Sequence, residues 1–179
     1  DKDLGDSSAR LYGVAADVAE QALAKTALEP AQRARAGLFV GSSSFDIRVQ
    51  EDNYRAELAA GGGAISLRDS GIGTLAARLA GSLGLRGPEF SFNTACTASA
   101  NALVAAIRQV ECGLLEHALV LGVELYNDVS ALGFHGLGLL TESVMAPFDA
   151  NRDGLVLGEG VSALVIGRAT ASQTGGFYL

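Results

Sequence analysis

Residues 89–99 read Glu-Phe-Ser-Phe-Asn-Thr-Ala-Cys-Thr-Ala-Ser, and they hold the clearest structural signal in the chain. Residues 89–94 alternate apolar and polar side chains as a strand does. They run without a spacer into an Ala-rich segment over about 97–112, whose larger apolar residues recur at helical spacing: Leu103, Ile107, Val110 and Leu114. The pattern predicts a strand that leads directly into a helix, with Cys96 at the junction. The helix is apolar enough on all sides that we expect it to be buried.

Helices and strands alternate along the rest of the chain. Helices are predicted over 6–27, 50–60 and 72–83, with a short irregular helix within 127–140. Continuous apolar runs predict buried strands over 36–41, 118–123 and 161–166. Residues 61–63 are expected to form a flexible break, and residues 175–179 a turn that opens a further strand. This alternation predicts one layered α/β domain without an internal boundary.

Composition excludes several classes of protein. The 179 residues are 49% hydrophobic and 18% charged, which excludes intrinsic disorder, and no apolar run is long enough to span a membrane. A net charge of −7 without a basic face argues against nucleic acid as a partner. Cys96 and Cys112 form no disulfide framework and have no neighbours at metal-ligand spacing. We therefore expect a cytoplasmic protein that binds neither nucleic acid nor membrane.

Cys96 is the first candidate for chemistry. Its small neighbours permit a tight turn and the close approach of a substrate. At the start of a helix, unpaired N–H groups and the helix dipole favour a thiolate, whereas burial opposes it. The pattern alone leaves two interpretations open, a nucleophile and a buried structural cysteine. Cys112, near the end of the same helix, is expected to be core or half-buried packing.

Two other groups of polar residues are weaker candidates. His117 and His135 are each either a base for Cys96 or an ordinary surface or packed histidine. Residues 147–160 form a polar, Gly-rich loop that has neither the ending of a phosphate-binding loop nor the spacing of a calcium loop. We expect an architectural loop beside the site, with an ion-paired turn formed by three of its residues: Asp149, Arg152 and Asp153.

Two motifs in order resemble the β-ketoacyl-acyl-carrier-protein synthases, which are condensing enzymes of the thiolase fold. They are Asn-Thr-Ala-Cys-Thr-Ala-Ser (93–99) and Pro-Phe-Asp-Ala-Asn-Arg-Asp-Gly-Leu-Val-Leu-Gly-Glu-Gly (147–160), with the apolar strand 118–123 between them. Leu85-Arg-Gly-Pro88 is also similar to the family. The resemblance implies a thiolase-like layered α-β-α fold built of two similar halves. Residues 1–179 would form the ketosynthase N-terminal domain, truncated at both ends.

The resemblance also implies an activity, a decarboxylative Claisen condensation in fatty-acid or polyketide synthesis. Cys96 would take an acyl group from acyl carrier protein as a thioester, which the carbanion from malonyl carrier protein then attacks. The Cys96 backbone N–H would supply one oxyanion-hole donor. Ser43, Ser44 and Phe45 match a segment that lines the acyl pocket, where Phe45 would restrict acyl length. No cofactor and no metal are expected.

Further expectations follow from the same resemblance. The family's catalytic His pair and Lys would lie beyond Leu179, so that neither His117 nor His135 takes that role and the 179 residues alone are inactive. A homodimer is expected through strand 89–94, which has no Pro and no Lys to protect an exposed edge; an interior strand is the alternative. Two other functions stay open: a non-catalytic partner subunit like a chain-length factor, which typically lacks the nucleophilic Cys, and a thiolase, which lacks the 147–160 pattern.

Overall fold

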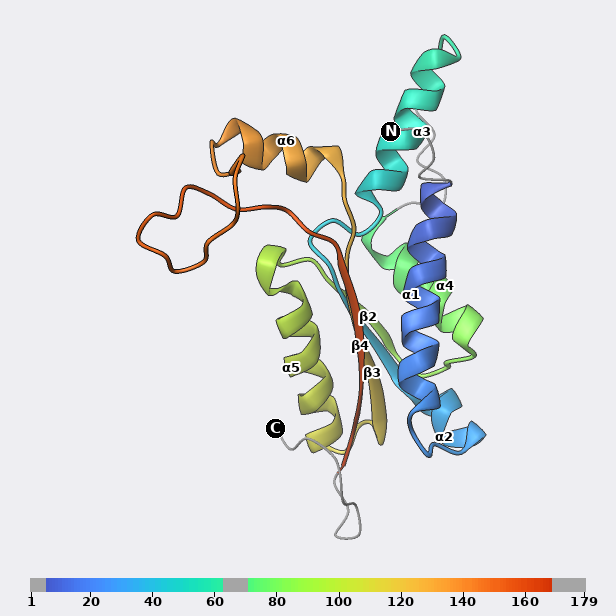
Figure 1. Ribbon diagram of the computed structural model, residues 1–179. Coiled ribbons are helices and arrows are strands. Elements are labelled where there is room, and N and C mark those ends of the chain that lie inside the picture. The colour runs from blue at the N-terminus through green and yellow to red at the C-terminus, as the bar shows by residue number, and fades with distance from the viewer. Residues whose placement is uncertain (1–5, 63–70, 169–179) are drawn as a thin grey trace.

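Four strands form one mixed sheet at the centre of the computed structural model, which describes residues 6–62 and 71–168 (Figure 1). The strand order is β2-β1-β3-β4. Their bounds are β1 Gly37–Gly41, β2 Glu89–Phe92, β3 His117–Glu124 and β4 Gly160–Gly167. β1 pairs in parallel with β2 and β3, whereas β4 runs antiparallel to β3. The strand expected within 175–179 and the end of the break expected at 61–63 lie outside the described residues.

Helices cover both faces of this sheet, and the expected layered α-β-α architecture is confirmed. Their bounds are α1 Ser7–Ala24, α2 Pro30–Arg35, α3 Ile47–Ala59, α4 Ile72–Leu83, α5 Ala98–Glu111 and α6 Asp128–Gly136. α1 and α4 lie on one face and α5 on the other, while α3 and α6 stand beyond the end of the sheet (Figure 1). Of these helices only the short α2 had no counterpart in the sequence prediction.

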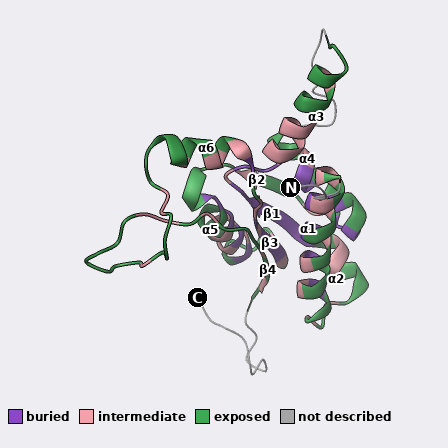
Figure 2. Cartoon of the chain, turned by 45° about the horizontal axis from the view of Figure 1, so that its top comes forward, coloured by how far each residue is buried: buried purple, intermediate pink, exposed green. Residues whose placement is uncertain are grey.

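The larger apolar core lies between the sheet and the layer of α1 and α4. α1 contributes a buried side chain at every fourth residue, which is the expected amphipathic pattern: Leu11, Ala15, Ala19 and Leu23. They meet the large side chains of the central strands and of α4, including Leu38, Leu75, Leu79, Leu119 and Leu121, each at most 1% exposed. The buried residues of the central strands are visible in Figure 2.

A smaller core lies under α5. The residues that α5 buries are mostly alanines one turn apart, Ala98, Ala102 and Ala106, followed by Val110. Ala102, Ala106 and Val110 pack on Phe39, Ala118 and Val120 of the two central strands. Phe39 also stacks against two side chains of β2, with ring centroids 5.2 Å from Phe90 and 6.5 Å from Phe92. These small residues let the backbone of α5 lie close to the sheet.

Two predictions of burial are wrong. α5 buries one face, made of three alanines and Val110, whereas Val104 on another face is 45% exposed and Leu114, just after the helix, is 70% exposed. β4 is an edge strand without a fully buried residue. Its Val161, Ala163 and Val165 pack on the larger core and its Ile166 on the smaller one, while Leu164 is 52% exposed. Apolar composition indicated that both elements pack against something, but not how completely each is covered.

Gly41 fixes the distance between β1 and the start of α5. A Cβ atom at this position would lie 2.5 Å from the backbone of both Ala98 and Ser99. The contact of Gly122 on β3 with α5 is less close, since a Cβ atom there would lie 3.2 Å from the Cβ of Ser99. The start of α5 therefore rests directly on the ends of two strands, and this contact positions the residues that come just before the helix.

We predict that Gly41→Ala destabilises the fold by about 1–3 kcal/mol, because the new methyl group overlaps backbone that cannot move independently. Chemical unfolding would measure this change. Gly13→Ala in α1 is the matched control: its Cβ meets no atom within 4 Å, and it should stabilise the helix by up to about 1 kcal/mol. Equal effects of the two substitutions would contradict the proposed close contact.

Candidate active site

Cys96 lies in a single 3₁₀ turn, Ala95–Thr97, between β2 and α5. Ala95 has a left-handed backbone with φ 52°, which is uncommon for a residue other than glycine. The turn is held by its own side chains: Thr97 Oγ1 donates to the Thr94 carbonyl at 2.7 Å, and Asn101 Nδ2 donates to Thr94 Oγ1 at 2.8 Å. The tight turn predicted from the small residues is confirmed, and it leaves Cys96 exposed.

Cys96 lies in a cleft of about 560 Å³ at one end of the sheet. The carboxyl ends of the parallel strands β1, β2 and β3 meet at this end, as at ligand sites of other α/β sheets. Residues 41–43, residues 122–127 and residues 157–162 form its walls, together with Ser130 and Phe134 of α6. The backbone N–H of Cys96 donates to no atom of residues 6–62 or 71–168, so it is free to bind a ligand oxygen.

The structure brings one of the three predicted substrate-binding residues to this cleft. Ser43 lines it beside Cys96. Ser44 and Phe45, each 4% exposed, instead line a smaller pocket between α1, α3 and Leu125, and Phe45 belongs to the larger apolar core. A role of these three residues in acyl binding stays a prediction. Of the three, only Ser43 lies where it could contact a group bound to Cys96.

Two carboxylates in the cleft wall were not singled out from the sequence. Glu159 accepts hydrogen bonds from both terminal guanidinium nitrogens of Arg10, at 2.8 and 2.7 Å. It also accepts one from the backbone N–H of Tyr126 at 2.8 Å. The Arg10 hydrogen bonds, followed by that of Tyr126, lower the pKa of Glu159 to about 2. Glu124 accepts hydrogen bonds from Ser43 and Ser44. Glu159 belongs to the 147–160 motif, but no local pattern links it to Arg10, 149 positions away.

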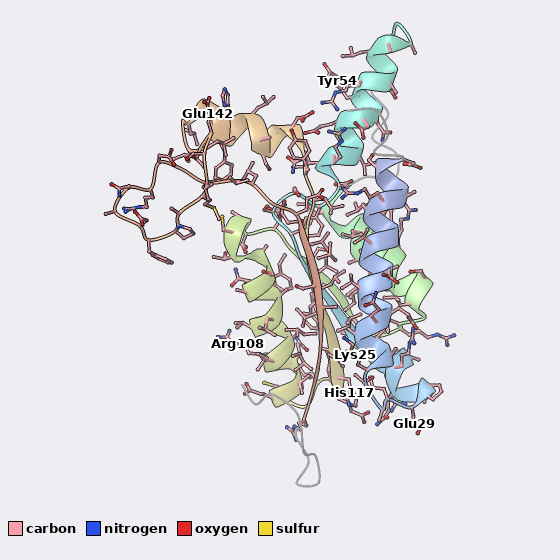
Figure 3. All side chains as sticks on the ribbon, in the orientation of Figure 1. Lys25, Glu29, Tyr54, Arg108, His117 and Glu142 are labelled. Carbon is pink, nitrogen blue, oxygen red and sulfur yellow. The ribbon has the colours of Figure 1, made fainter. Side chains whose placement is uncertain are left out.

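Neither histidine lies in the cleft. His117 is the first residue of β3, and Cys96 follows the last residue of the parallel strand β2, so that the two stand at opposite ends of the sheet. Figure 3 shows His117 at the end of the sheet away from α6. His135 is exposed on α6 and does not line the cleft. A base for Cys96 is therefore not supplied by a histidine of the described part of the chain.

Two further expectations are wrong. Cys112 is not packed in a core: it is the exposed C-cap of α5, at the end of the helix away from Cys96. Asp149, Arg152 and Asp153 of the 147–160 loop form no ion pair with one another. Arg152 donates to the carbonyl of Asp149, and Asp153 accepts from Thr141 and Ser143. The loop is thus held to the preceding segment by hydroxyl groups.

Residues 6–62 and 71–168 contain no group of three or more His, Cys, Asp or Glu side chains placed to hold a metal ion. None of their helices combines the length and the apolarity that crossing a membrane requires.

Comparison with known proteins identifies the family. The family model described as "Beta-ketoacyl synthase, N-terminal domain" matches residues 6–172. The chain belongs to the β-ketoacyl synthase family. Polyketide synthase ThaG of Burkholderia thailandensis is 33% identical over 147 residues, which are 81% of this chain and 2% of that protein. The 3-oxoacyl-(acyl-carrier-protein) synthase 2 of Vibrio cholerae is 28% identical over 169 residues, which are 87% of this chain and 40% of that protein.

A solved ketosynthase complex contains a chain with the same fold. The complex of ketosynthase ApeO with its chain length factor ApeC from Xenorhabdus doucetiae superposes with a TM-score of 0.64 and 26% identity, over 84% of this chain and 38% of that chain. The thiolase-like fold that the motifs implied is confirmed. The chain spans 40% or less of the length of these three proteins.

Because Arg10 and Tyr126 favour the ionised form of Glu159, we predict that its carboxylate stabilises the fold above pH 5. The contribution should shrink as pH falls from about 4.5 toward 2, since a carboxylate with a lowered folded pKa loses its advantage on protonation. Glu159→Gln should lower the free energy of unfolding by about 0.5–1 kcal/mol at pH 7, because solvent screens side chains that are 35% exposed.

Urea unfolding of the wild-type protein and of Glu159→Gln, at pH 7 and at pH 3, measures the difference in free energy of unfolding. Glu142→Gln is the control, since Glu142 is exposed. A Glu159→Gln effect as large at pH 3 as at pH 7 would contradict the assignment.

Proposed function

We propose that Cys96 is the acyl-accepting nucleophile of a β-ketoacyl-acyl-carrier-protein synthase, an acyltransferase of fatty-acid or polyketide synthesis in the cytoplasm. The observation that supports this most directly is the exposure of Cys96 inside the cleft, on a 3₁₀ turn that precedes α5 and begins with the left-handed Ala95. Unpaired N–H groups and the dipole at that end of a helix stabilise a developing oxyanion.

Two transfers make up the proposed reaction. The Cys96 thiolate attacks the carbonyl carbon of an acyl-carrier thioester, and the carrier thiolate leaves and takes up a proton. Malonyl carrier protein then loses CO₂, and the electron pair of the broken C–C bond attacks the Cys96 thioester. The new C–C bond forms as Cys96 leaves as thiolate. The free N–H of Cys96 is one donor to the oxyanion of each tetrahedral intermediate.

The groups that promote decarboxylation are expected outside the described residues, because no histidine of the described chain lines the cleft. We infer that residues 1–179 alone accept an acyl group but do not complete condensation.

The alternatives receive less support. A thiolase disagrees with the family match, which is to β-ketoacyl synthases. A partner subunit like a chain-length factor stays open in principle, since the ApeO structure is a complex of a ketosynthase with one. The presence of Cys96 in an accessible turn favours the catalytic subunit, because a non-catalytic partner has no use for an exposed nucleophile.

We predict that Cys96 is acylated when the protein is incubated with an octanoyl-carrier thioester, and that Cys96→Ala lowers incorporation to background. Intact mass and peptide mapping would locate the acyl group. Cys112→Ala is the matched control, because Cys112 is also exposed but lies at the other end of α5. Acylation of both cysteines at similar rates, or of neither, would contradict the nucleophile assignment.

Acyl carrier protein and a second copy of the chain are the proposed partners. The Vibrio cholerae relative is named for the carrier protein. For the homodimer, the support is the position of β2 at the edge of the sheet. The N–H groups of Leu38 on β1 and of Ser42 just after it donate to the carbonyls of Pro88 and Phe92. Because backbone direction alternates along a strand, Ser91 turns its N–H away from β1, toward the open edge.

We predict that Ser91→Pro shifts the protein from dimer to monomer while the fold is kept, because proline removes an N–H that only a second strand would use. Sedimentation at micromolar concentration, with circular dichroism as the check on folding, measures this. Ser91→Ala is the matched control and should stay dimeric. A wild-type protein that sediments as a monomer would contradict pairing through this strand.

A further inference from the structure

Glu124 carries an unusual set of partners for a carboxylate in the cleft wall. It is the last residue of β3, and Ser43 donates to its Oε2 through both the backbone N–H at 3.0 Å and Oγ at 2.6 Å. Ser44 Oγ donates to its Oε1 at 2.5 Å. No ion pair to Glu124 is found among residues 6–62 and 71–168, in contrast to Glu159. Three neutral donors from one short segment therefore satisfy this charge.

The segment that Glu124 holds is a strained turn over residues 42–45. Ser42 Oγ accepts the N–H groups of Ser44 at 3.2 Å and of Phe45 at 2.7 Å. Phe45 is left-handed, with φ 46°, and 4% exposed. A bulky residue in that conformation persists only where its surroundings determine it. The Glu124 carboxylate is the strongest anchor available, because hydrogen bonds to a charged group exceed those between neutral groups.

The same turn also contacts the segment that leads to Cys96. Ser42 N–H donates to the Phe92 carbonyl at 3.1 Å, and Asn93 Nδ2 approaches the Ser43 carbonyl at 3.4 Å. Since β1 lies between β2 and β3, its terminal turn touches the Cys96 segment on one side and Glu124 on the other. A displacement of the turn would change the wall that faces the Cys96 thiol.

We propose that Glu124 is a positioning residue: its carboxylate fixes the 42–45 turn, so that Ser42 and Ser43 keep their place in the wall against which a chain attached to Cys96 lies. The contacts of Glu124 do not depend on the reaction that the protein catalyses. Only the statement that the chain on Cys96 is an acyl group rests on the proposed function. Glu124 itself touches no reacting atom in this scheme. It acts by holding Ser43 in the cleft and Phe45 in the core.

The rate at which maleimides label Cys96 tests whether this wall is ordered. The maleimides share one reactive group and differ in chain length. With an ordered wall, N-decylmaleimide should label Cys96 about tenfold faster than N-ethylmaleimide, because the decyl chain is buried before the bond forms. Cys112, exposed outside the cleft, should show no such preference and serves as the internal control. The intact protein is used, and peptide mapping separates the two sites.

Glu124→Leu removes the acceptors at similar size and should abolish the decyl preference of Cys96. Glu124→Gln should keep most of it, since its carbonyl accepts from Ser43 and its NH₂ donates to the Ser44 hydroxyl. If Glu124→Leu does not fold, Ser43→Ala combined with Ser44→Ala, which removes two of the three donors, should reduce the preference several-fold. A preference unchanged by these variants, or absent from the wild-type protein, would overturn the proposal.

Acyl transfer from a carrier thioester is measured in parallel on the same variants. A Cys96 that keeps its chain-length preference but takes no acyl group would contradict the proposed function and leave the role of Glu124 standing.

Discussion

The close approach of α5 to the ends of β1 and β3 is the constraint on which the rest of the site depends. Gly41 has no space for a Cβ, which would lie 2.5 Å from the backbone of Ala98. The alanines along the buried face of α5 continue this contact down the sheet. A helix held this closely delivers the residues before it, including Cys96, to the carboxyl ends of the parallel strands. A bulkier side chain at the crossing would move the thiol out of the cleft.

The cleft itself is held mainly by polar contacts. Glu159 joins α1 to the end of the 147–160 loop through Arg10, while Glu124 joins β3 to the turn after β1. α3 buries none of its residues, and its Glu51 accepts the N–H groups of Asp128 and Val129 at the start of α6. The end of the molecule that holds α3 and α6 is correspondingly the more exposed one (Figure 2). The apolar core supports the sheet, and charged and hydroxyl groups set the shape of its functional edge.

Cys96 and its turn show how such an arrangement suits acyl transfer. The turn stores backbone strain at Ala95 and stabilises it through Thr94, Thr97 and Asn101 rather than through burial. The thiol therefore stays accessible while its backbone is fixed. The backbone N–H of Cys96 is fixed and available in the same way, since it finds no acceptor in the described part of the chain. A fixed, accessible thiol beside a free donor is what a thioester-forming site requires.

The sequence by itself determined most of the elements, the position of Cys96 between a strand and a helix, and the family. These features depend on local periodicity and on motifs of consecutive residues, which short-range sterics fix. Only the tertiary structure decided which side of α5 is covered, because apolar residues on several faces are all compatible with helical spacing. It also separated His117 from Cys96 and moved Ser44 and Phe45 out of the cleft. The pairs Arg10–Glu159 and Ser43–Glu124 join residues 149 and 81 positions apart. Strand order brings such residues together, and strand order is set by packing of the whole sheet, which leaves no local trace in the sequence.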